Sequence, residues 1–352
     1  MKILWITEFF PESSKAETTG GVETRCFFVN RYLQERGHDI KIIARPTSGS
    51  VWKTASFSSI PRRVWFTLGA LVRGLAGTFD VVEGTNFTTY PVAWLVGTLK
   101  RKPVVFWYPD VFLGLWINAI GLVGVIGELA EWVILRLPVS RYIAISNSTK
   151  NKLIKAGVPA EKIDVIYCGI DPKEAKNVGG SKKKFDVCVV SRLVSYKKVD
   201  DLIRVIPADL KVAVVGQGPQ LGRLKKLSAG KRVKFFGYLP SRKKVLKIMA
   251  SSKIFCLPSA VEGFGIVVIE AAAVGVPYVA RNIPAISEVT KNGLGGLLFS
   301  RNKDIAPAID TLLANRRLYQ RKTREAKKLA AGYQWDDIAR QTTDVYEKVL
   351  AA

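Results

Sequence analysis

The sequence predicts an α/β protein built from two Rossmann-like domains, each a doubly wound parallel sheet. The chain has 352 residues, which is more than one hydrophobic core usually serves. Short apolar runs of strand character alternate with longer helix-like segments in both halves. A polar, glycine-bearing stretch, residues 173–184, lies between them. We therefore expect an N-terminal domain over residues 1–172, a linker over 173–184, a second domain over 185–333 and a final helix over 334–352.

The first half begins with a βαβ unit. A strand at residues 2–7 is followed by a polar loop that ends in Gly20-Gly21, then by a helix at 24–36 and a strand at 39–44. Because a strand follows Lys2 at once, we expect no signal peptide. The remaining elements expected in this half are strands at 80–83, 103–107 and 142–146 and a helix at 147–156.

Two apolar segments interrupt this alternation. Residues 51–77 mix tryptophan and phenylalanine with lysine and arginine, which suits an interfacial helix and equally a helix packed on the sheet. Residues 111–127 contain no charge, but they are shorter than the ~20 apolar residues of a membrane-spanning helix. We interpret 111–127 as an apolar surface or lid that either stays outside a bilayer or dips into it.

The second half repeats strands that end in glycine-rich turns. A strand at 185–190 leads into Ser191–Lys198, and a strand at 212–215 leads into Gly216-Gln217-Gly218-Pro219. A third strand, at 233–236, precedes Gly237-Tyr238. The carboxyl ends of parallel strands share one edge of a sheet, where ligands bind, so these turns are expected to meet there.

Residues 257–280 are the segment that indicates most about function. A strand ending at Leu257 runs into Glu262, the triplet Gly263-Phe264-Gly265 and an apolar helix that contains Glu270. The N–H groups at the start of such a helix bind anionic or hydroxyl-rich ligands. If all eight intervening steps are helical, the two glutamates lie roughly 12 Å apart. One carboxylate could then face a sugar while the other faces a ribose.

The whole string, Pro-Ser-x-x-Glu-Gly-Phe-Gly-x-x-x-x-Glu-Ala-x-x-x-Gly-x-Pro from Pro258 to Pro277, resembles the donor-site signature of glycosyltransferase family 4. Members of that family are retaining enzymes of the GT-B fold. The resemblance covers nearly the whole chain and is stronger in the C-terminal half. It implies that residues 1–172 bind the acceptor, that 185–333 bind a nucleotide-sugar donor across a cleft, and that the final helix crosses back to the N-terminal domain.

The resemblance also implies roles for individual residues. Arg192 and Lys197 match cations that stabilise the leaving diphosphate. Glu262 and the N–H groups after it would hold sugar hydroxyls, and Glu270 would accept the ribose hydroxyls. The full donor-binding set that it implies is Gly20, Gly21, Gly216, Gly237, Tyr238, Gly263, Phe264, Gly265, Ile266 and Glu270.

This sequence departs from the family pattern in three places. Many members carry a histidine near the attacked carbon, whereas here the nearest group able to accept a proton or to bond the sugar is Asp110. Ser191 and Lys198 replace two glycines of the cationic motif, and Cys168 stands where asparagine is usual. We therefore include Asp110, with Glu262, Arg192 and Lys197, among the candidate catalytic residues.

The sequence predicts neither a metal site nor a cofactor. No Asp-x-Asp occurs, so we expect a metal-independent transferase. The four cysteines lie far apart and are expected to be buried thiols in a reducing compartment. They are Cys26, Cys168, Cys188 and Cys256.

The chain is strongly basic, with a formal net charge of +25. Residues 1–173 hold 21 Lys/Arg against 14 Asp/Glu (+7), and residues 174–352 hold 33 against 15 (+18). Such an excess suits nucleic acid or anionic lipid, or reflects a generally basic proteome. No helix-turn-helix, zinc finger or aromatic–basic RNA motif occurs.

The leading hypothesis is a retaining glycosyltransferase that moves a hexose (mannose, glucose or N-acetylhexosamine) from a UDP- or GDP-sugar to a hydroxyl. The expected acceptor is a lipid-linked glycan or glycolipid, and the expected location is cytoplasmic, peripheral on the inner face of the cell membrane. One alternative is a soluble transferase that makes a polysaccharide or small glycoside. Another is a basic nucleic-acid-binding protein on a degenerate GT-B scaffold, which intact Glu262, Glu270, Arg192 and Lys197 disfavour.

Overall fold

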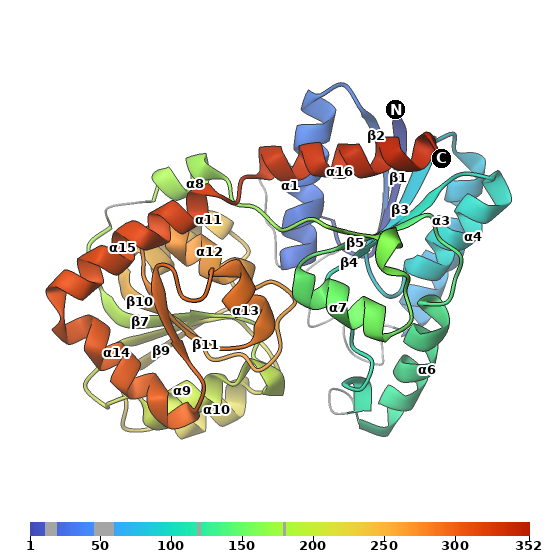
Figure 1. Ribbon diagram of the computed structural model, residues 1–352. Coiled ribbons are helices and arrows are strands. Elements are labelled where there is room, and N and C mark those ends of the chain that lie inside the picture. The colour runs from blue at the N-terminus through green and yellow to red at the C-terminus, as the bar shows by residue number, and fades with distance from the viewer. Residues whose placement is uncertain (11–19, 46–59, 118–120, 179–180) are drawn as a thin grey trace. The chain divides into compact units, whose positions relative to one another are not determined.

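The computed structural model describes residues 1–10, 20–45, 60–117, 121–178 and 181–352 (Figure 1). Contacts divide the chain into two compact units: Met1–Cys168 together with Trp335–Ala352 form unit 1, and Gly169–Gln334 form unit 2. Each unit holds one six-stranded sheet, and the strand pairs in both sheets are parallel. The predicted α/β class with two doubly wound sheets is confirmed.

The sheet of unit 1 has the strand order β2-β1-β3-β4-β5-β6. Its strands are short and buried, as expected for a parallel sheet covered on both faces, and all five residues of β4 are buried. Their bounds are β1 Lys2–Thr7, β2 Asp39–Ala44, β3 Val81–Gly84, β4 Val104–Tyr108, β5 Arg141–Ala144 and β6 Ile163–Val165.

Helices cover the two faces of this sheet. The connection from β1 to β2 runs toward one edge, whereas those from β2 to β3, β3 to β4 and β4 to β5 run the other way. Because parallel crossovers are right-handed, α1 lies on one face with α16 packed on it, and α3, α4 and α6 lie on the opposite face (Figure 1). The helices of unit 1 are α1 Gly21–Glu35, α3 Ile60–Ala76, α4 Tyr90–Lys100, η2 Gly121–Val123, α6 Gly124–Ile134, α7 Asn147–Lys155, η3 Ala160–Lys162 and α16 Trp335–Leu350.

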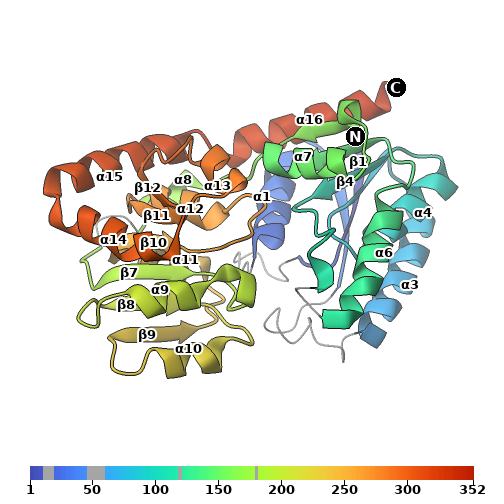
Figure 2. The ribbon, with the colours of Figure 1, turned by 60° about the horizontal axis from the view of Figure 1, so that its bottom comes forward.

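Unit 2 has the strand order β12-β11-β10-β7-β8-β9, with β7 and β10 at its centre. Its strands are β7 Phe185–Val190, β8 Val212–Val215, β9 Val233–Gly237, β10 Ser252–Leu257, β11 Tyr278–Arg281 and β12 Gly296–Phe299. Its helices are α8 Pro172–Lys176, η4 Ser195–Lys197, α9 Val199–Val205, α10 Leu221–Leu227, α11 Arg242–Ala250, α12 Ile266–Ala273, α13 Pro284–Val289, η5 Asn302–Asp304, α14 Ile305–Ala314 and α15 Arg316–Ala331. Figure 2 shows these helices around the second sheet.

The chain is divided somewhat differently from the linker expected at 173–184. The boundary between the units falls after Cys168, and Pro172–Lys176 already form a helix of unit 2, α8. Asp171 caps this helix, since its carboxylate accepts a hydrogen bond from the N–H of Lys173 at 2.8 Å. The composition of 173–184 looked like a linker because α8 is short and highly charged.

The two apolar segments are only partly described. Residues 46–59 and 118–120 lie outside the described residues, as do 11–19 of the loop before Gly20. What is described of 51–77 is α3, and what is described of 111–127 is a turn, η2 and the start of α6. None of the described helices is both long and apolar enough to cross a membrane.

Candidate functional site

The loop between β10 and α12 forms the centre of the site in unit 2. Gly265 precedes α12 with φ = +85°, and a Cβ there would lie 2.4 Å from Cδ1 of Ile286, so the position requires glycine. Phe264 is buried beside it, edge-to-face with Tyr333 at 5.7 Å between ring centroids. Since a helix leaves its first N–H groups without intrahelical partners, this turn holds a set of donors, beginning at Ile266, at the carboxyl edge of the sheet.

Glu262 and Lys197 meet in front of this turn. Nζ of Lys197 lies 2.6 Å from Oε1 of Glu262, and the side chains are 12% and 11% exposed. The N–H of Ala260 also donates to the carbonyl of Tyr196 at 2.9 Å. The two motifs, 65 positions apart in the sequence, therefore form one site, as their shared edge of the sheet predicts.

Arg192 lies on the same turn. Its Nη2 donates to the hydroxyl of Tyr196 at 2.6 Å, and the ring of Tyr196 lies 5.9 Å from the guanidinium and 5.5 Å from Nζ of Lys197. Lys198 has φ = +50°, so it adopts the left-handed conformation that the family's glycine would favour, although it carries a side chain.

Gly216 is packed tightly against the cationic turn. Its φ is +135°, and a Cβ would lie 1.8 Å from the carbonyl oxygen of Ser191. Its N–H donates to the carbonyl of Gly237 at 2.8 Å. Gly237 has φ = +67°, and Tyr238 after it is half-buried. This hydrogen bond from Gly216 to Gly237 therefore holds the two glycine turns together at the edge of the site.

Glu270 has a partner that local spacing did not reveal. It lies in α12 with an exposure of 6%, and its Oε1 is 2.5 Å from Nη1 of Arg242. Arg242, which begins α11, also lies 2.6 Å from Oε2 of Glu174 in α8. Burial raises the pKa of the Glu270 carboxyl, and Arg242 opposes this rise. Burial lowers the pKa of Arg242, but the two carboxylates outweigh it, so the pKa is raised overall and the guanidinium stays charged.

The resemblance implies that Glu270 accepts ribose hydroxyls, and the structure shows that this carboxylate is already bound to the buried guanidinium of Arg242. Glu270 can still accept ribose hydroxyls through its second oxygen, and Arg242 fixes the direction in which that oxygen points.

The candidates in unit 1 follow the carboxyl ends of its strands or begin its first helix. Gly20 is the extended residue before α1, and Gly21 is the first helical residue. Asp110 follows β4, and its Oδ1 lies 2.6 Å from Nζ of Lys152 in α7. The proposed proton acceptor therefore already has a cationic partner.

A second charged group at this edge was not predicted. Glu8, directly after β1, is 2% exposed, and its Oε1 lies 3.0 Å from both Arg45 and Arg63. Its Oε2 accepts hydrogen bonds from Asn86 at 3.2 Å and Thr88 at 2.9 Å. The partners lie up to 80 positions away, but a polar residue directly after a strand was a signal that could have identified Glu8.

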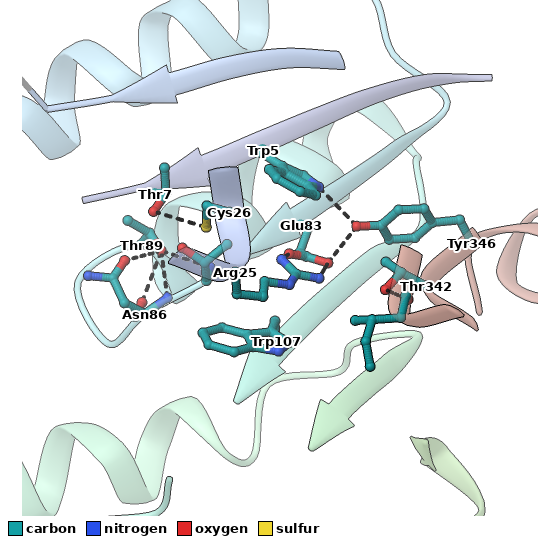
Figure 3. Close-up of polar contacts among 12 residues, drawn as sticks. Trp5, Thr7, Arg25, Cys26, Glu83, Asn86, Thr89, Trp107, Thr342 and Tyr346 are labelled. Atoms are coloured by element: carbon teal, nitrogen blue, oxygen red, sulfur yellow. Dashed lines mark hydrogen bonds and ion pairs between the residues drawn. The ribbon is translucent and has the colours of Figure 1, made fainter. Parts of the chain in front are cut away.

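A fully buried ion pair lies inside unit 1 (Figure 3). Arg25 of α1 pairs with Glu83 of β3, and its guanidinium lies about 5 Å from the ring centroids of Trp5 and Trp107. The hydroxyl of Tyr346 in α16 donates to Glu83 at 2.6 Å and accepts from Nε1 of Trp5 at 2.9 Å. Burial and the charge of Glu83 raise the pKa of Tyr346 well above its usual value. The cluster thus joins α16 to the core of unit 1 through the hydroxyl of Tyr346.

All four cysteines are buried and none of them forms a disulfide, as predicted. Burial raises the pKa of the Cys26 thiol to about 11 and that of Cys188 to about 12, so these thiols are neutral and unreactive. Within the described ranges no three His, Cys, Asp or Glu side chains gather in a way that could hold a metal ion.

Two six-stranded parallel sheets, the second with a glycine-containing turn before a helix at its carboxyl edge, define a GT-B protein, and solved structures agree. Sucrose-phosphate synthase of Thermosynechococcus elongatus matches with a TM-score of 0.80 at 17% identity over 99% of each chain. Anabaena HepE, in complex with UDP-glucose, matches with a TM-score of 0.77 at 19% identity over 99% of this chain and 100% of that chain.

Sequence comparison identifies the family. The model "Glycosyltransferase Family 4" matches residues 19–174, and "Glycosyl transferases group 1" matches residues 171–329. The chain belongs to glycosyltransferase family 4.

Two relatives are similar to this chain over different lengths. An uncharacterized glycosyltransferase of Methanocaldococcus jannaschii is 29% identical in an alignment of 231 positions that covers 58% of this chain and 59% of that protein. The match thus spans less than two thirds of that relative. A phosphatidylinositol N-acetylglucosaminyltransferase subunit of Arabidopsis thaliana is 24% identical in a gapped alignment of 382 positions that covers 99% of this chain and 82% of that protein.

Proposed function

We propose that this glycosyltransferase moves a hexosyl group from a UDP- or GDP-sugar to a hydroxyl acceptor with retention of anomeric configuration. The observation that carries the proposal is the Lys197–Glu262 pair, 2.6 Å apart at the start of α12 with Arg192 on the same turn. Cations for a diphosphate and a carboxylate for sugar hydroxyls are thereby held together at the carboxyl edge of one sheet.

The charges suit departure of a nucleoside diphosphate. As the bond between the anomeric carbon and the β-phosphate oxygen breaks, negative charge grows on that oxygen, and Lys197 and Arg192 stabilise it. Glu262 and the N–H groups from Gly263 to Ile266 hold the sugar. The acceptor oxygen bonds to the anomeric carbon on the face that the diphosphate leaves, and the departing phosphate takes the acceptor's proton.

The nucleotide would lie along Gly216, Gly237 and Tyr238, with Glu270 on the ribose. In unit 1 the N–H groups of the Gly20-Gly21 turn would contact the donor phosphate. Asp110, whose Oδ1 lies 2.6 Å from Nζ of Lys152, would hydrogen-bond the transferring sugar. We propose that no metal ion takes part, because Lys197 and Arg192 would supply the positive charge that the leaving diphosphate needs.

For the donor sugar we favour an N-acetylhexosamine over glucose or mannose, because relatives from a plant and two yeasts are named phosphatidylinositol N-acetylglucosaminyltransferase subunits. The same names favour a lipid-linked acceptor. We place the enzyme on the cytoplasmic face of the cell membrane, as a peripheral protein. A polysaccharide or small-glycoside acceptor is the alternative.

The test is a donor panel in the presence of EDTA. The purified chain is incubated with UDP-N-acetylglucosamine, UDP-glucose or GDP-mannose and with phosphatidylinositol or a polyprenyl-phosphate sugar as acceptor. We expect nucleotide release and an α-linked product, identified by NMR, from one donor, and a loss of about a hundredfold in Glu262→Gln. A β-linked product would overturn retention, and activity only after addition of a divalent cation would overturn metal independence. No product or nucleotide release with any donor would overturn the proposal.

A further inference from the structure

Solvent-exposed hydrophobic side chains are concentrated on one face of unit 1. Among the described residues, 15 large hydrophobic side chains are exposed: 12 belong to α3, α4, η2 or α6, and one, Ile117, precedes η2 in the chain. The remaining two, Ile154 and Leu350, lie elsewhere in unit 1, and the described part of Gly169–Gln334 holds none. An exposed patch of this kind marks an interaction surface.

Helix α6 has the reverse of the usual polarity of a surface helix. Its outward stripe is apolar and includes Ile126 and Leu129, exposed by 70% and 63%, and Leu122 of η2 before it is 87% exposed. Its two carboxylates point inward. Glu131 is 2% exposed and accepts hydrogen bonds from Tyr108, from the N–H of Phe112 and from Trp116, and Glu128 accepts from the N–H groups of Gly114 and Trp116. The acids that would normally keep such a helix in water are thus used to hold the 112–116 turn.

Helix α3 contributes a second apolar stripe on the same face of the sheet. Trp65 is 75% exposed and Val72 67%, with Val64 and Leu68 on the same side, whereas Phe66 and Ala70 of the opposite side are buried in the core. Figure 2 shows α3, α4 and α6 running along one side of unit 1. The face of α3, α4, η2 and α6 that carries these side chains is called the apolar face.

The charges at the edge of the apolar face all have one sign. The three helices contain no carboxylate besides Glu128 and Glu131, and six cationic side chains at their ends are exposed: Arg62, Arg73, Lys100, Arg101, Lys102 and Arg136. Arg136 lies over the half-exposed ring of Trp132 at 3.7 Å. Tryptophan and arginine beside an apolar stripe are the composition of helices that lie in the headgroup region of a bilayer.

We propose that the apolar face docks this enzyme on an anionic lipid bilayer, with the outward stripes of α3 and α6 inserted and the six cations at the headgroups. A second copy of the chain fits poorly, because the same face would bring six cations against six with no carboxylate between them. The proposal rests on the proposed function and extends it, because an enzyme with a lipid-linked acceptor must reach that acceptor at a membrane surface. It assigns that contact to unit 1 alone.

The first experiment measures flotation of the full chain with vesicles, without any donor. Vesicles of phosphatidylcholine with about a third phosphatidylglycerol should bind the protein at least tenfold more tightly than phosphatidylcholine alone, because each Lys or Arg near the surface contributes ~1 kcal/mol. The variant Trp65→Gln/Leu122→Gln/Ile126→Gln/Leu129→Gln should lose about a hundredfold in partition. The matched control, Ile154→Gln/Leu350→Gln, changes two exposed side chains outside the face and should bind like wild type.

Equal partition of the two variants would overturn the proposal. A lipid-free wild type that is dimeric, and that the four-residue variant converts to a monomer, would assign the face to a second copy instead. Because no donor is present, loss of glycosyl transfer cannot imitate either result, and failure of the donor panel leaves the vesicle result standing.

A second measurement does not depend on removing hydrophobic side chains. The native cysteines are buried, so Leu122→Cys labelled with a nitroxide reports from one position, and Ile154→Cys is its control. On anionic vesicles the label at 122 should become accessible to oxygen and protected from a water-soluble nickel chelate, whereas the label at 154 should stay in water. A label at 122 that stays fully accessible to the chelate would overturn the proposal even if the chain binds vesicles.

Discussion

Lys197 is the residue whose charge the proposed reaction needs most directly. Its only described ion-pair partner is Glu262, and both side chains are nearly buried. When a donor binds, the ammonium can share its charge between the carboxylate and the diphosphate without a large movement. We expect Lys197→Met to lower kcat by about a hundredfold, as loss of one stabilising group in a transition state usually does.

A matched control is available in the same unit. Arg223 pairs with Asp200 at 3.5 Å on the surface, where its side chain is 58% exposed, and Arg223→Met should leave kcat within about twofold because exposed pairs contribute little. Steady-state kinetics on the preferred donor compare the two variants. Equal losses would mean that the positive charge of unit 2 matters in general and that the Lys197 position does not.

Arg242 provides a prediction about pH. In Arg242→Met, Glu270 stays buried without its cation, and breaking such a pair costs about 3–5 kcal/mol at neutral pH. Burial already raises the pKa of Glu270, and loss of Arg242 raises it further. The folded state then binds a proton that the unfolded state releases, so the free energy of unfolding increases as pH falls toward the unfolded pKa. The deficit of the variant should therefore shrink between pH 8 and pH 5.

Urea denaturation at several pH values measures this dependence. Glu174→Gln is the companion variant, because it removes the half-exposed partner of Arg242 and leaves the Arg242–Glu270 pair in place. It should destabilise unit 2 much less, and it should raise the donor KM with little change in kcat if Arg242 orients Glu270 toward the ribose. A deficit in Arg242→Met that does not depend on pH would contradict the ion pair.

The sequence predicts which candidate residues lie together where their spacing is local. The turn from Glu262 to Ile266 and the pair Arg192 and Lys197 could be placed because each follows a strand of the same sheet. Arg242 could not, because its partners lie 28 and 68 positions away and carry no shared motif. The partners of Glu8 could not be placed for a similar reason, since Asn86 and Arg63 reach it only in the folded unit.

At the scale of elements, hydrophobic pattern located most strands. The strands expected at 39–44 and 212–215 are β2 and β8 with the same bounds, because apolar runs between turn residues are typical of parallel strands. Helix α1 begins at Gly21 and not at residue 24, since Gly20 is the extended residue before it. The polarity of α6 could not be predicted, because its acids are inward only through hydrogen bonds to a turn 12 to 19 positions earlier.

Helix α16 depends on a hydroxyl for its attachment to unit 1. Tyr346 bonds both Glu83 and Trp5 inside the core, so Tyr346→Phe leaves a buried carboxylate oxygen with one donor fewer. We expect unit 1 to lose about 1–3 kcal/mol of unfolding free energy, measured by urea denaturation. Tyr167→Phe is the matched control, since the hydroxyl of Tyr167 bonds Asn147 near the surface, and it should cost less than about 0.5 kcal/mol. Equal losses would mean that α16 is held by apolar contacts such as Trp335 on Phe28.

At the scale of the whole molecule, the chain contains two cores. Each unit has its own sheet and its own buried cluster, and units of this kind need not unfold together. The net charge of the two halves also differs, because most of the positive excess lies in the second half. The two units are therefore expected to respond to different ligands, nucleotide for unit 2 and lipid for the apolar face of unit 1.

Calorimetry tests this division. We expect two transitions, one lowered by Tyr346→Phe and the other raised by the nucleoside diphosphate of the preferred donor. At a concentration of 100 Kd the nucleotide adds about 2.7 kcal/mol to the unit that binds it, which is a rise of roughly 5–10 °C for a domain of this size. Glu270→Gln should reduce the rise, because the ribose loses a charged acceptor. The transition that Tyr346→Phe does not lower is assigned to unit 2. If neither UDP nor GDP raised the temperature of that transition, the donor site would not be in unit 2. The roles of Arg192, Lys197 and Glu270 would then have to be abandoned together.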